Sequence, residues 1–171
     1  MPLFKFIVYL IVISNYINSC SSANLYSKKV FRTGVNILYG EISSEELFAE
    51  FPRWKELYDE YVPDSKLVSS ISSATADIKV EIFLGTWCGD SRREVPKFLK
   101  IADQCDCFGQ DNIRLWAVDR NKSLDSGLTN DKKIKRVATF IFLRNGVEIG
   151  RIVERIKSGS LEQDIYEILK G

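Results

Sequence analysis

Between residues 80 and 96 the chain reads Val80-Glu-Ile-Phe-Leu-Gly-Thr-Trp-Cys-Gly-Asp-Ser-Arg-Arg-Glu-Val-Pro96. The first five residues form a mainly apolar run that predicts a buried strand, and residues 85–89 predict a turn. We expect a helix over Ser91–Gln104. Cys88 therefore stands between the end of a strand and the start of a helix, where unpaired backbone N–H groups and the helix dipole favour a reactive thiolate.

Strands and helices alternate in the rest of the C-terminal half. Asn145-Gly146 is a strong hairpin signal, Ser160 can cap a final helix, and a short helical piece is expected near Lys132. Apolar runs predict three further strands, at Ile113–Val118, Thr139–Leu143 and Val147–Val153. This order combines a parallel crossover with an antiparallel edge, so we expect an α/β fold in which helices flank a mixed central sheet.

Two segments resemble the signatures of thioredoxin-family proteins. Trp87-Cys88 at a helix start, with Pro96 eight residues after the cysteine, resembles the active-site segment of that family. Thr139-Phe-Ile-Phe142, followed by Asn145-Gly-Val-Glu-Ile-Gly150, resembles the strand and hairpin that face the active site. The resemblance implies a thioredoxin-like domain over 77–171, with Cys88 as its reactive thiol and thiol-disulfide exchange as its activity.

Three positions depart from the family pattern. Ser91 stands where a dithiol enzyme has its second cysteine, so another thiol, such as a low-molecular-weight one, would have to resolve a mixed disulfide at Cys88. Ala138 replaces the family's cis-proline, and because a non-proline cis bond costs about 3 kcal/mol or more, we expect a trans bond. Ile82 occupies the position of the family's buried carboxylate, and the neighbouring Glu81 should point to the other face of the strand.

The predicted site has Cys88 and Ser91 as its catalytic positions, since the Ser91 hydroxyl could donate a hydrogen bond to the thiolate. Arg92 adds positive potential near the sulfur, and Asp90 opposes it. The surrounding positions are Trp87, Gly89, Asp90, Arg92, Ala138 and Thr139. An inert buried thiol is the alternative, but packing explains a cysteine on a Gly-flanked turn poorly.

The N-terminus resembles a bacterial lipoprotein signal. Met1–Ser19 contains one charged residue and a short apolar run, and Ile17-Asn-Ser-Cys20 places an aliphatic residue three positions before a cysteine. The resemblance implies that 1–19 is a signal peptide and that Cys20 is the lipidated first residue of an extracytoplasmic, membrane-anchored protein. A cleaved secretion signal and an uncleaved anchor are the alternatives. Residues 20–42 are expected to form a tether and N-terminal extension.

Residues 43–76 are expected to form a helical extension before the thioredoxin-like domain. Ser43 and Glu46 make a capping-box pattern in front of an apolar helical face. Pro52 is expected to divide this face between two helices, and Asp64 can cap a third.

Composition narrows the chemistry that is available. The 171 residues include no histidine, which excludes a Ser-His-Asp triad, a Cys-His dyad and any zinc or haem site that needs imidazole. The 24 basic and 23 acidic residues nearly balance, so no nucleic-acid partner is expected. We predict neither a metal site nor an organic cofactor, because exchange at a thiol requires neither.

Cys105 and Cys107 are the remaining cysteines. Helical rise of about 1.5 Å per residue would place them about 25 Å from Cys88, so neither can resolve a disulfide there. If Cys20 is lipidated, three thiols remain, and a local Cys105–Cys107 disulfide is the simplest arrangement in an oxidising compartment. Two reduced thiols, or a second redox pair, are the alternatives.

The leading function is thiol-disulfide exchange by a monothiol route, in which Cys88 reacts with protein or low-molecular-weight thiols and disulfides. The competing function is a non-catalytic lipoprotein whose groove binds a protein or peptide, the lost cysteine and proline marking lost redox activity. Peroxide reduction ranks below both, because the chain lacks the Thr and Arg arrangement that such relatives place around the cysteine.

Overall fold

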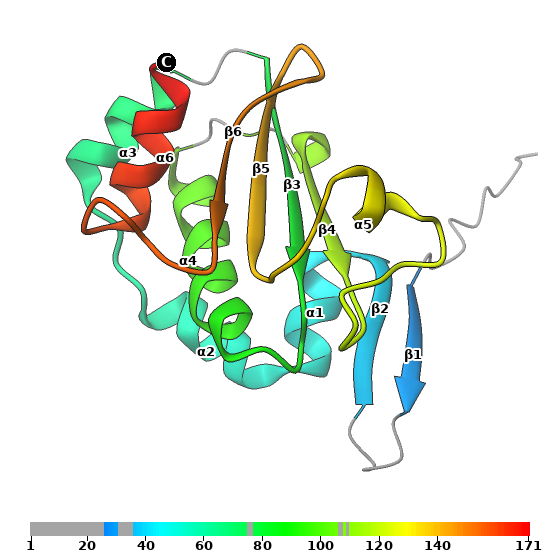
Figure 1. The fold of residues 1–171 in the computed structure, drawn as a ribbon. Coiled ribbons are helices and arrows are strands. Elements are labelled where there is room, and N and C mark those ends of the chain that lie inside the picture. Colours follow the sequence, from blue (N-terminus) through cyan, green and yellow to red (C-terminus); the bar gives the residue numbers. More distant parts are fainter. Residues whose placement is uncertain (1–25, 31–35, 75–76, 106–107, 109) are drawn as a thin grey trace, which may run out of the picture.

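The computed structural model describes residues 26–30, 36–74, 77–105, 108 and 110–171. These residues form a six-stranded sheet with the order β1-β2-β4-β3-β5-β6 (Figure 1). The strands are β1 (Tyr26–Val30), β2 (Asn36–Ile42), β3 (Ile78–Leu84), β4 (Ile113–Ala117), β5 (Thr139–Arg144) and β6 (Val147–Val153). β3 and β4 are parallel, and the other neighbouring strands are antiparallel. The predicted α/β fold with a mixed central sheet is confirmed.

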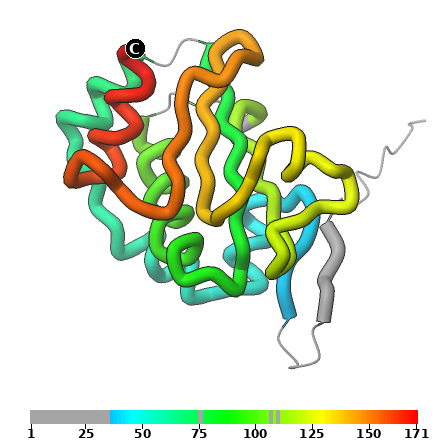
Figure 2. Tube along the Cα trace, viewed as in Figure 1, coloured from blue at the N-terminus to red at the C-terminus, as the bar shows by residue number. Residues whose placement is uncertain are grey.

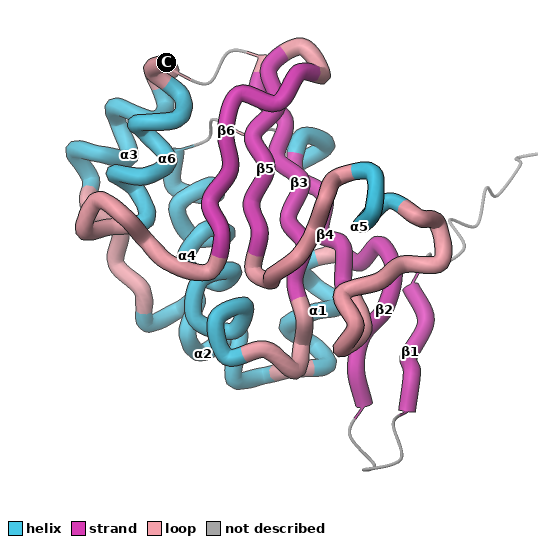
Figure 3. Tube along the Cα trace, in the orientation of Figure 1, coloured by secondary structure: helices cyan, strands magenta, loops and turns pink. Residues whose placement is uncertain are grey.

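Helices cover one face of this sheet, as Figures 1 and 3 show. The helices on this face are α1 (Ser44–Glu50), α2 (Pro52–Glu60), α3 (Ser65–Ser72), α4 (Gly89–Cys105) and α6 (Leu161–Leu169). The short α5 (Leu128–Asp131) and the loop around it lie over the opposite face, and a single turn of 3-10 helix (Gln110–Asn112) precedes β4. The segment that carries Cys88 therefore leaves β3 at the end of the sheet and enters α4, which packs against the helix-covered face.

The sheet separates two hydrophobic cores. The helix-side core includes the fully buried residues Trp54, Ile71, Ile82, Phe98, Phe140 and Phe142. The loop-side core, on the opposite face, includes Tyr39, Phe83, Val118, Ile141 and Leu143. Trp87 and Cys88 pack against the loop-side core. Apolar contacts therefore hold the turn that carries Trp87 and Cys88 against this face of the sheet.

Local capping chemistry sets the starts of several helices, as the sequence predicts. The Ser43 hydroxyl accepts from the Glu46 N–H, and the Glu46 carboxylate accepts from the Ser43 N–H, which completes the capping box of α1. Pro52 opens α2 directly after α1 ends. Asp64 and Ser160 cap α3 and α6 with their side-chain oxygens. At the β5–β6 hairpin, Asn145 and Gly146 both have positive φ, as a type I′ turn requires.

β2 is a strand that the sequence does not predict. Its residues Ile37, Leu38 and Tyr39 are all buried, so the apolar positions are consecutive rather than alternating. Its pairing partner β4 lies far along the chain, with Glu41 opposite Trp116. Figure 2 shows this blue segment beside the much later yellow-green one. Burial on both faces, and not local sequence, explains the strand.

Several predictions concern residues outside the described part of the chain. These are the signal peptide at 1–19, the lipidation of Cys20 and the participation of Cys107 in a disulfide. The division of the chain at residue 77 also stays a prediction. Within the described ranges, every helix is too short or too polar to span a bilayer.

Candidate active site

Cys88 lies in the turn that joins β3 to α4. Its backbone N–H donates to the Gly85 carbonyl at 2.9 Å, and its own carbonyl accepts from the Arg92 N–H at 3.0 Å as the helix begins. The side chain is a free thiol and is half-buried. The Sγ atom donates a hydrogen bond to the Val137 carbonyl oxygen at 3.1 Å. The loop before β5 therefore closes over one side of the sulfur.

The Val137–Ala138 peptide bond is cis, so the expectation of a trans bond is wrong. The surroundings of Ala138 account for this geometry. Its side chain is fully buried, its carbonyl accepts from the Glu154 N–H at 2.8 Å, and the Thr139 hydroxyl donates to the Arg136 carbonyl at 2.7 Å. Alanine at this position intrinsically favours a trans bond, but these tertiary contacts hold the Val137–Ala138 bond in the cis form.

Trp87 forms the wall of the turn on the loop side. Its indole Nε1 donates to the Val118 carbonyl at 3.1 Å, which ties the turn to the end of β4. The Arg120 guanidinium lies over its ring, 5.5 Å from the ring centre. Gly85 gives the ring its space, because a β-carbon there would come within 2.6 Å of Trp87 Cε2.

Ser91 lies in the first turn of α4 and is completely buried. Its hydroxyl accepts a hydrogen bond from the Gly85 N–H at 3.1 Å. This bond runs back to the end of β3 and uses the hydroxyl as an acceptor, so the predicted donation from Ser91 to the Cys88 sulfur stays a prediction. Ser91 thus helps to hold the turn on which the thiol sits.

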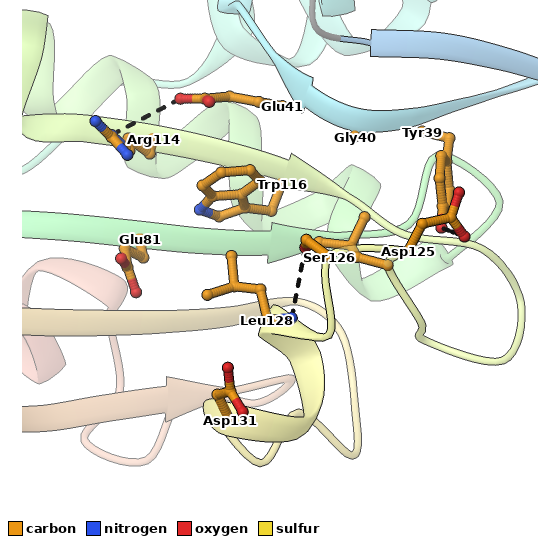
Figure 4. A pocket seen from close by; sticks show the side chains of 11 residues that line it. Tyr39, Gly40, Glu41, Glu81, Arg114, Trp116, Asp125, Ser126, Leu128 and Asp131 are labelled. Carbon is orange, nitrogen blue, oxygen red and sulfur yellow. Dashed lines mark hydrogen bonds and ion pairs between the residues drawn. The ribbon is translucent and has the colours of Figure 1, made fainter.

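Glu81 and Ile82 point to opposite faces of β3, as expected. Ile82 is fully buried in the helix-side core. Glu81 lies on the other face, where its carboxylate pairs with Lys132 Nζ at 2.6 Å. It lines a cavity of about 630 Å³ together with Trp116 and the aspartates Asp125 and Asp131, as Figure 4 shows. This cavity contains none of the predicted site residues.

A second cleft of about 630 Å³ lies between the first turn of α4 and α2. It is lined by Arg53, Leu57, Gly89, Asp90, Arg92 and Arg93. Arg93 pairs with Asp90 at 2.8 Å and with the buried Glu94 at 2.5 Å. Hydrogen bonds to Glu94 and then Asp90 raise the pKa of Arg93, so its charge persists at any physiological pH. The predicted Gly89, Asp90 and Arg92 therefore come together at this cleft.

Sequence reasoning missed three residues of this site. Arg53 comes from α2, well before the motif, and no local pattern connects it to the cysteine. Val137 supplies the carbonyl that contacts the sulfur. Its position directly before Ala138, which the family pattern places near the active site, could have identified it. Gly85 was read only as a turn residue, although its N–H and its missing β-carbon both shape the turn.

The other cysteine of the described residues lies at the far end of α4. Cys105 is disulfide-bonded, whereas Cys88 is free. The predicted partner, Cys107, lies outside the described residues, so the Cys105–Cys107 pairing stays a prediction. Across the described ranges, acidic, Cys and His side chains form no group of three or more that could hold a metal ion.

Comparisons with known proteins give a family match and several similar solved structures. Residues 44–160 match the family described as thioredoxin, a match that includes α1, α2 and α3. Thioredoxin 1 of Thermosipho africanus is 23% identical, with 54% of this chain and 94% of that chain covered and a TM-score of 0.42. Thioredoxin of Schistosoma mansoni is 25% identical, with coverage of 63% and 90% and a TM-score of 0.39. An HIV epitope-scaffold protein is 15% identical, with coverage of 75% and 87% and a TM-score of 0.50, a likeness of fold alone.

The family match and the structure support each other. The match covers more than half of the chain, and it includes both the turn that carries Cys88 and the hairpin that faces it. The strand order places β3 between β4 and β5, so that the cysteine turn and the Val137–Thr139 segment meet at one end of the sheet. This protein therefore belongs to the thioredoxin family.

Proposed function

We propose that this protein carries out thiol-disulfide exchange by a monothiol route, with Cys88 as the nucleophile. Thiol-disulfide exchange is the chemistry of the thioredoxin family. The observation that carries the proposal is a free, half-buried thiol at the start of a 17-residue helix, with a buried serine in place of a second cysteine. The helix start supplies unpaired N–H groups that stabilise a thiolate, which is the attacking form.

The exchange takes place in two balanced steps. The Cys88 thiolate attacks one sulfur of a disulfide R–S–S–R′, a new Cys88–S–S–R bond forms, and R′–S⁻ leaves with the electron pair of the broken bond. A second thiolate, R″–S⁻, then attacks the R sulfur, which releases R–S–S–R″ and regenerates the Cys88 thiolate. Ser91 cannot act as the second thiol, so the resolving thiol comes from solution.

We also propose that the domain acts outside the cytoplasm as a lipid-anchored protein. The support is the signal-like segment Met1–Ser19 and the Ile17-Asn-Ser-Cys20 sequence. Labelling of the full chain with a radioactive fatty acid in a bacterial host, compared with a Cys20→Ser variant, tests this proposal. Incorporation that is equal in both chains would contradict it.

The exchange activity is tested with the full chain, a glutathione mixed disulfide and excess glutathione. We expect turnover in the unaltered protein and none with Cys88→Ser, together with a Cys88–glutathione adduct visible by intact mass. Turnover that survives in Cys88→Ser would exclude Cys88 as the nucleophile. Absence of both turnover and adduct in the unaltered protein would favour the non-catalytic binding module.

A further inference from the structure

Basic side chains line two clefts next to the segments that surround the Cys88 thiol, although the whole chain is nearly neutral. On the helix side, the cleft between α2 and α4 is lined by Arg53, Arg92 and Arg93 against one acidic residue, Asp90. Gly89, which also lines this cleft, is bonded directly to Cys88. An anionic group in the cleft would therefore lie beside the reactive turn.

The three arginines of the cleft are not equivalent. Arg53 pairs with Glu56 at 2.7 Å, and Arg93 pairs with Asp90 and Glu94. Arg92 is exposed, and no described residue forms an ion pair with it. The Arg92 guanidinium is therefore available to pair with a ligand, whereas Arg53 and Arg93 already pair with neighbouring carboxylates.

A second basic cavity lies on the strand side of the site. Its volume is about 360 Å³, and it is lined by Lys133, Lys135, Arg136, Thr139, Arg151 and Val153, with no acidic residue among them. Arg136 pairs with Glu154 at 3.0 Å, while Lys135 has no ion pair with a described residue. This cavity adjoins the segment of the cis bond, because Thr139 follows Ala138 directly.

Glu154 contacts one lining residue of each cavity. Glu154 accepts from Arg136 with its carboxylate, and its backbone carbonyl lies 3.5 Å from Arg93 Nη2. The Cys88 thiol contacts the Val137 carbonyl, and each of these two residues is a chain neighbour of a cavity-lining residue, Gly89 on the helix side and Arg136 on the strand side. A small disulfide whose sulfur atoms contact Cys88 could therefore place one half of the molecule in each cavity. Small-molecule sites have volumes of roughly 300–1,000 Å³, a range that includes both cavities.

We infer that the disulfide exchanged at Cys88 is a low-molecular-weight one that carries carboxylates, held by Arg92 on the helix side and Lys135 on the strand side. This inference rests on the proposed function, and it adds the substrate class. The monothiol route fits such a substrate, because a small anionic thiol can enter the same cavities to resolve the mixed disulfide. The negative charge of the substrate supplies selectivity, because Arg92 and Lys135 would repel a cationic disulfide.

The test compares small disulfides of opposite charge. Dithiodipropionate is a dianion and cystamine a dication of similar size, and the rate constant for the Cys88 adduct is measured with each by intact mass at low salt. The readout is the ratio of the two rate constants, compared between variants, so that differences in leaving-group thiols cancel. The variants are Arg92→Gln, Lys135→Gln and the double substitution, with Lys66→Gln on α3 as a charge-matched control.

We expect each single substitution to lower the anion-to-cation ratio about 3-fold and the double substitution about 10-fold, as exposed ion pairs of modest strength predict. Lys66→Gln should leave the ratio unchanged, and added salt should reduce it in the unaltered protein. A ratio that is unchanged in the double variant overturns this inference and leaves the proposed function standing. Failure of the unaltered protein to form a Cys88 adduct with either probe, or with neutral hydroxyethyl disulfide, overturns the proposed function itself.

Discussion

The Ser91 hydroxyl accepts a hydrogen bond from the Gly85 N–H at 3.1 Å, and this contact joins the first turn of α4 to the end of β3. Both residues are buried. The intervening residues carry Trp87 and Cys88, so the contact closes the base of the loop that presents the thiol. Ser91, which stands where a dithiol enzyme has its second cysteine, therefore helps to hold the Cys88 loop in place.

Replacing Ser91 with alanine should lower the free energy of unfolding by about 1–2 kcal/mol, because the buried Gly85 N–H would lose its acceptor. Urea unfolding followed by circular dichroism measures this loss. Ser69→Ala is the matched control, since Ser69 is an exposed helical serine whose hydroxyl donates to the Ser65 carbonyl. Equal stability of the two variants would show that the Gly85 contact contributes nothing.

Replacing Ser91 with cysteine should convert the site to a dithiol. Position 91 is three residues after Cys88 at the start of α4, which is the Cys-X-X-Cys spacing of dithiol sites. We expect Ser91→Cys to form an internal disulfide between Cys88 and the introduced thiol under mild oxidation, seen as a mass loss of two hydrogens and the loss of two free thiols. A chain with both Cys88→Ser and Ser91→Cys that showed the same loss would refute the pairing.

Gly85 and Gly89 should respond differently to alanine. A β-carbon at Gly85 would lie 2.6 Å from the Trp87 ring, whereas one at Gly89 would have no heavy atom within 4 Å. We expect Gly85→Ala to displace Trp87, change the near-UV circular dichroism and cost about 1–3 kcal/mol. Gly89→Ala should keep the spectrum and the stability, because alanine favours a helix more than glycine does. Similar spectra for both variants would contradict this account of the turn.

Stability should fall at alkaline pH partly through Tyr39. Burial, and then its hydrogen bond to Asp125, raise the pKa of Tyr39 from 10.0 to about 12. The unfolded chain therefore loses this proton first, so the contribution to stability is complete below pH 10 and is lost as the pH rises to about 12. Urea unfolding at several pH values across this window should show a shallower decline for Tyr39→Phe. An identical decline in both proteins would show that Tyr39 does not contribute.

The parts of the fold that the sequence predicts are those with local causes. The caps at Ser43, Asp64 and Ser160 act within one helical turn, and the Asn145-Gly146 turn needs only its own two residues. β3 is recognisable because its apolar run ends at a turn. These features depend on neighbours within a few positions, and so their residue types suffice.

The parts that the sequence does not predict depend on distant partners. The cis bond at Ala138 is held by contacts with Glu154 and with the buried surroundings, which residue type does not reveal. The hydrogen bond that the Ser91 hydroxyl accepts from the Gly85 N–H depends on the packing of the helix start against the end of β3, which the sequence does not reveal. Overall charge balance does not reveal local clustering, and folding brings basic side chains from α2, α4, β6 and the loop before β5 into two clefts.

The position of β2 has a consequence for biosynthesis. A ribosome makes β2 well before β4, and β4 is the strand that pairs with its inner edge. Until Ile113–Ala117 emerges, that edge of β2 has no strand to pair with. We therefore expect nascent chains that stall before β4 to bind chaperones or to aggregate. The sheet can be completed only late in synthesis, after β4 has emerged.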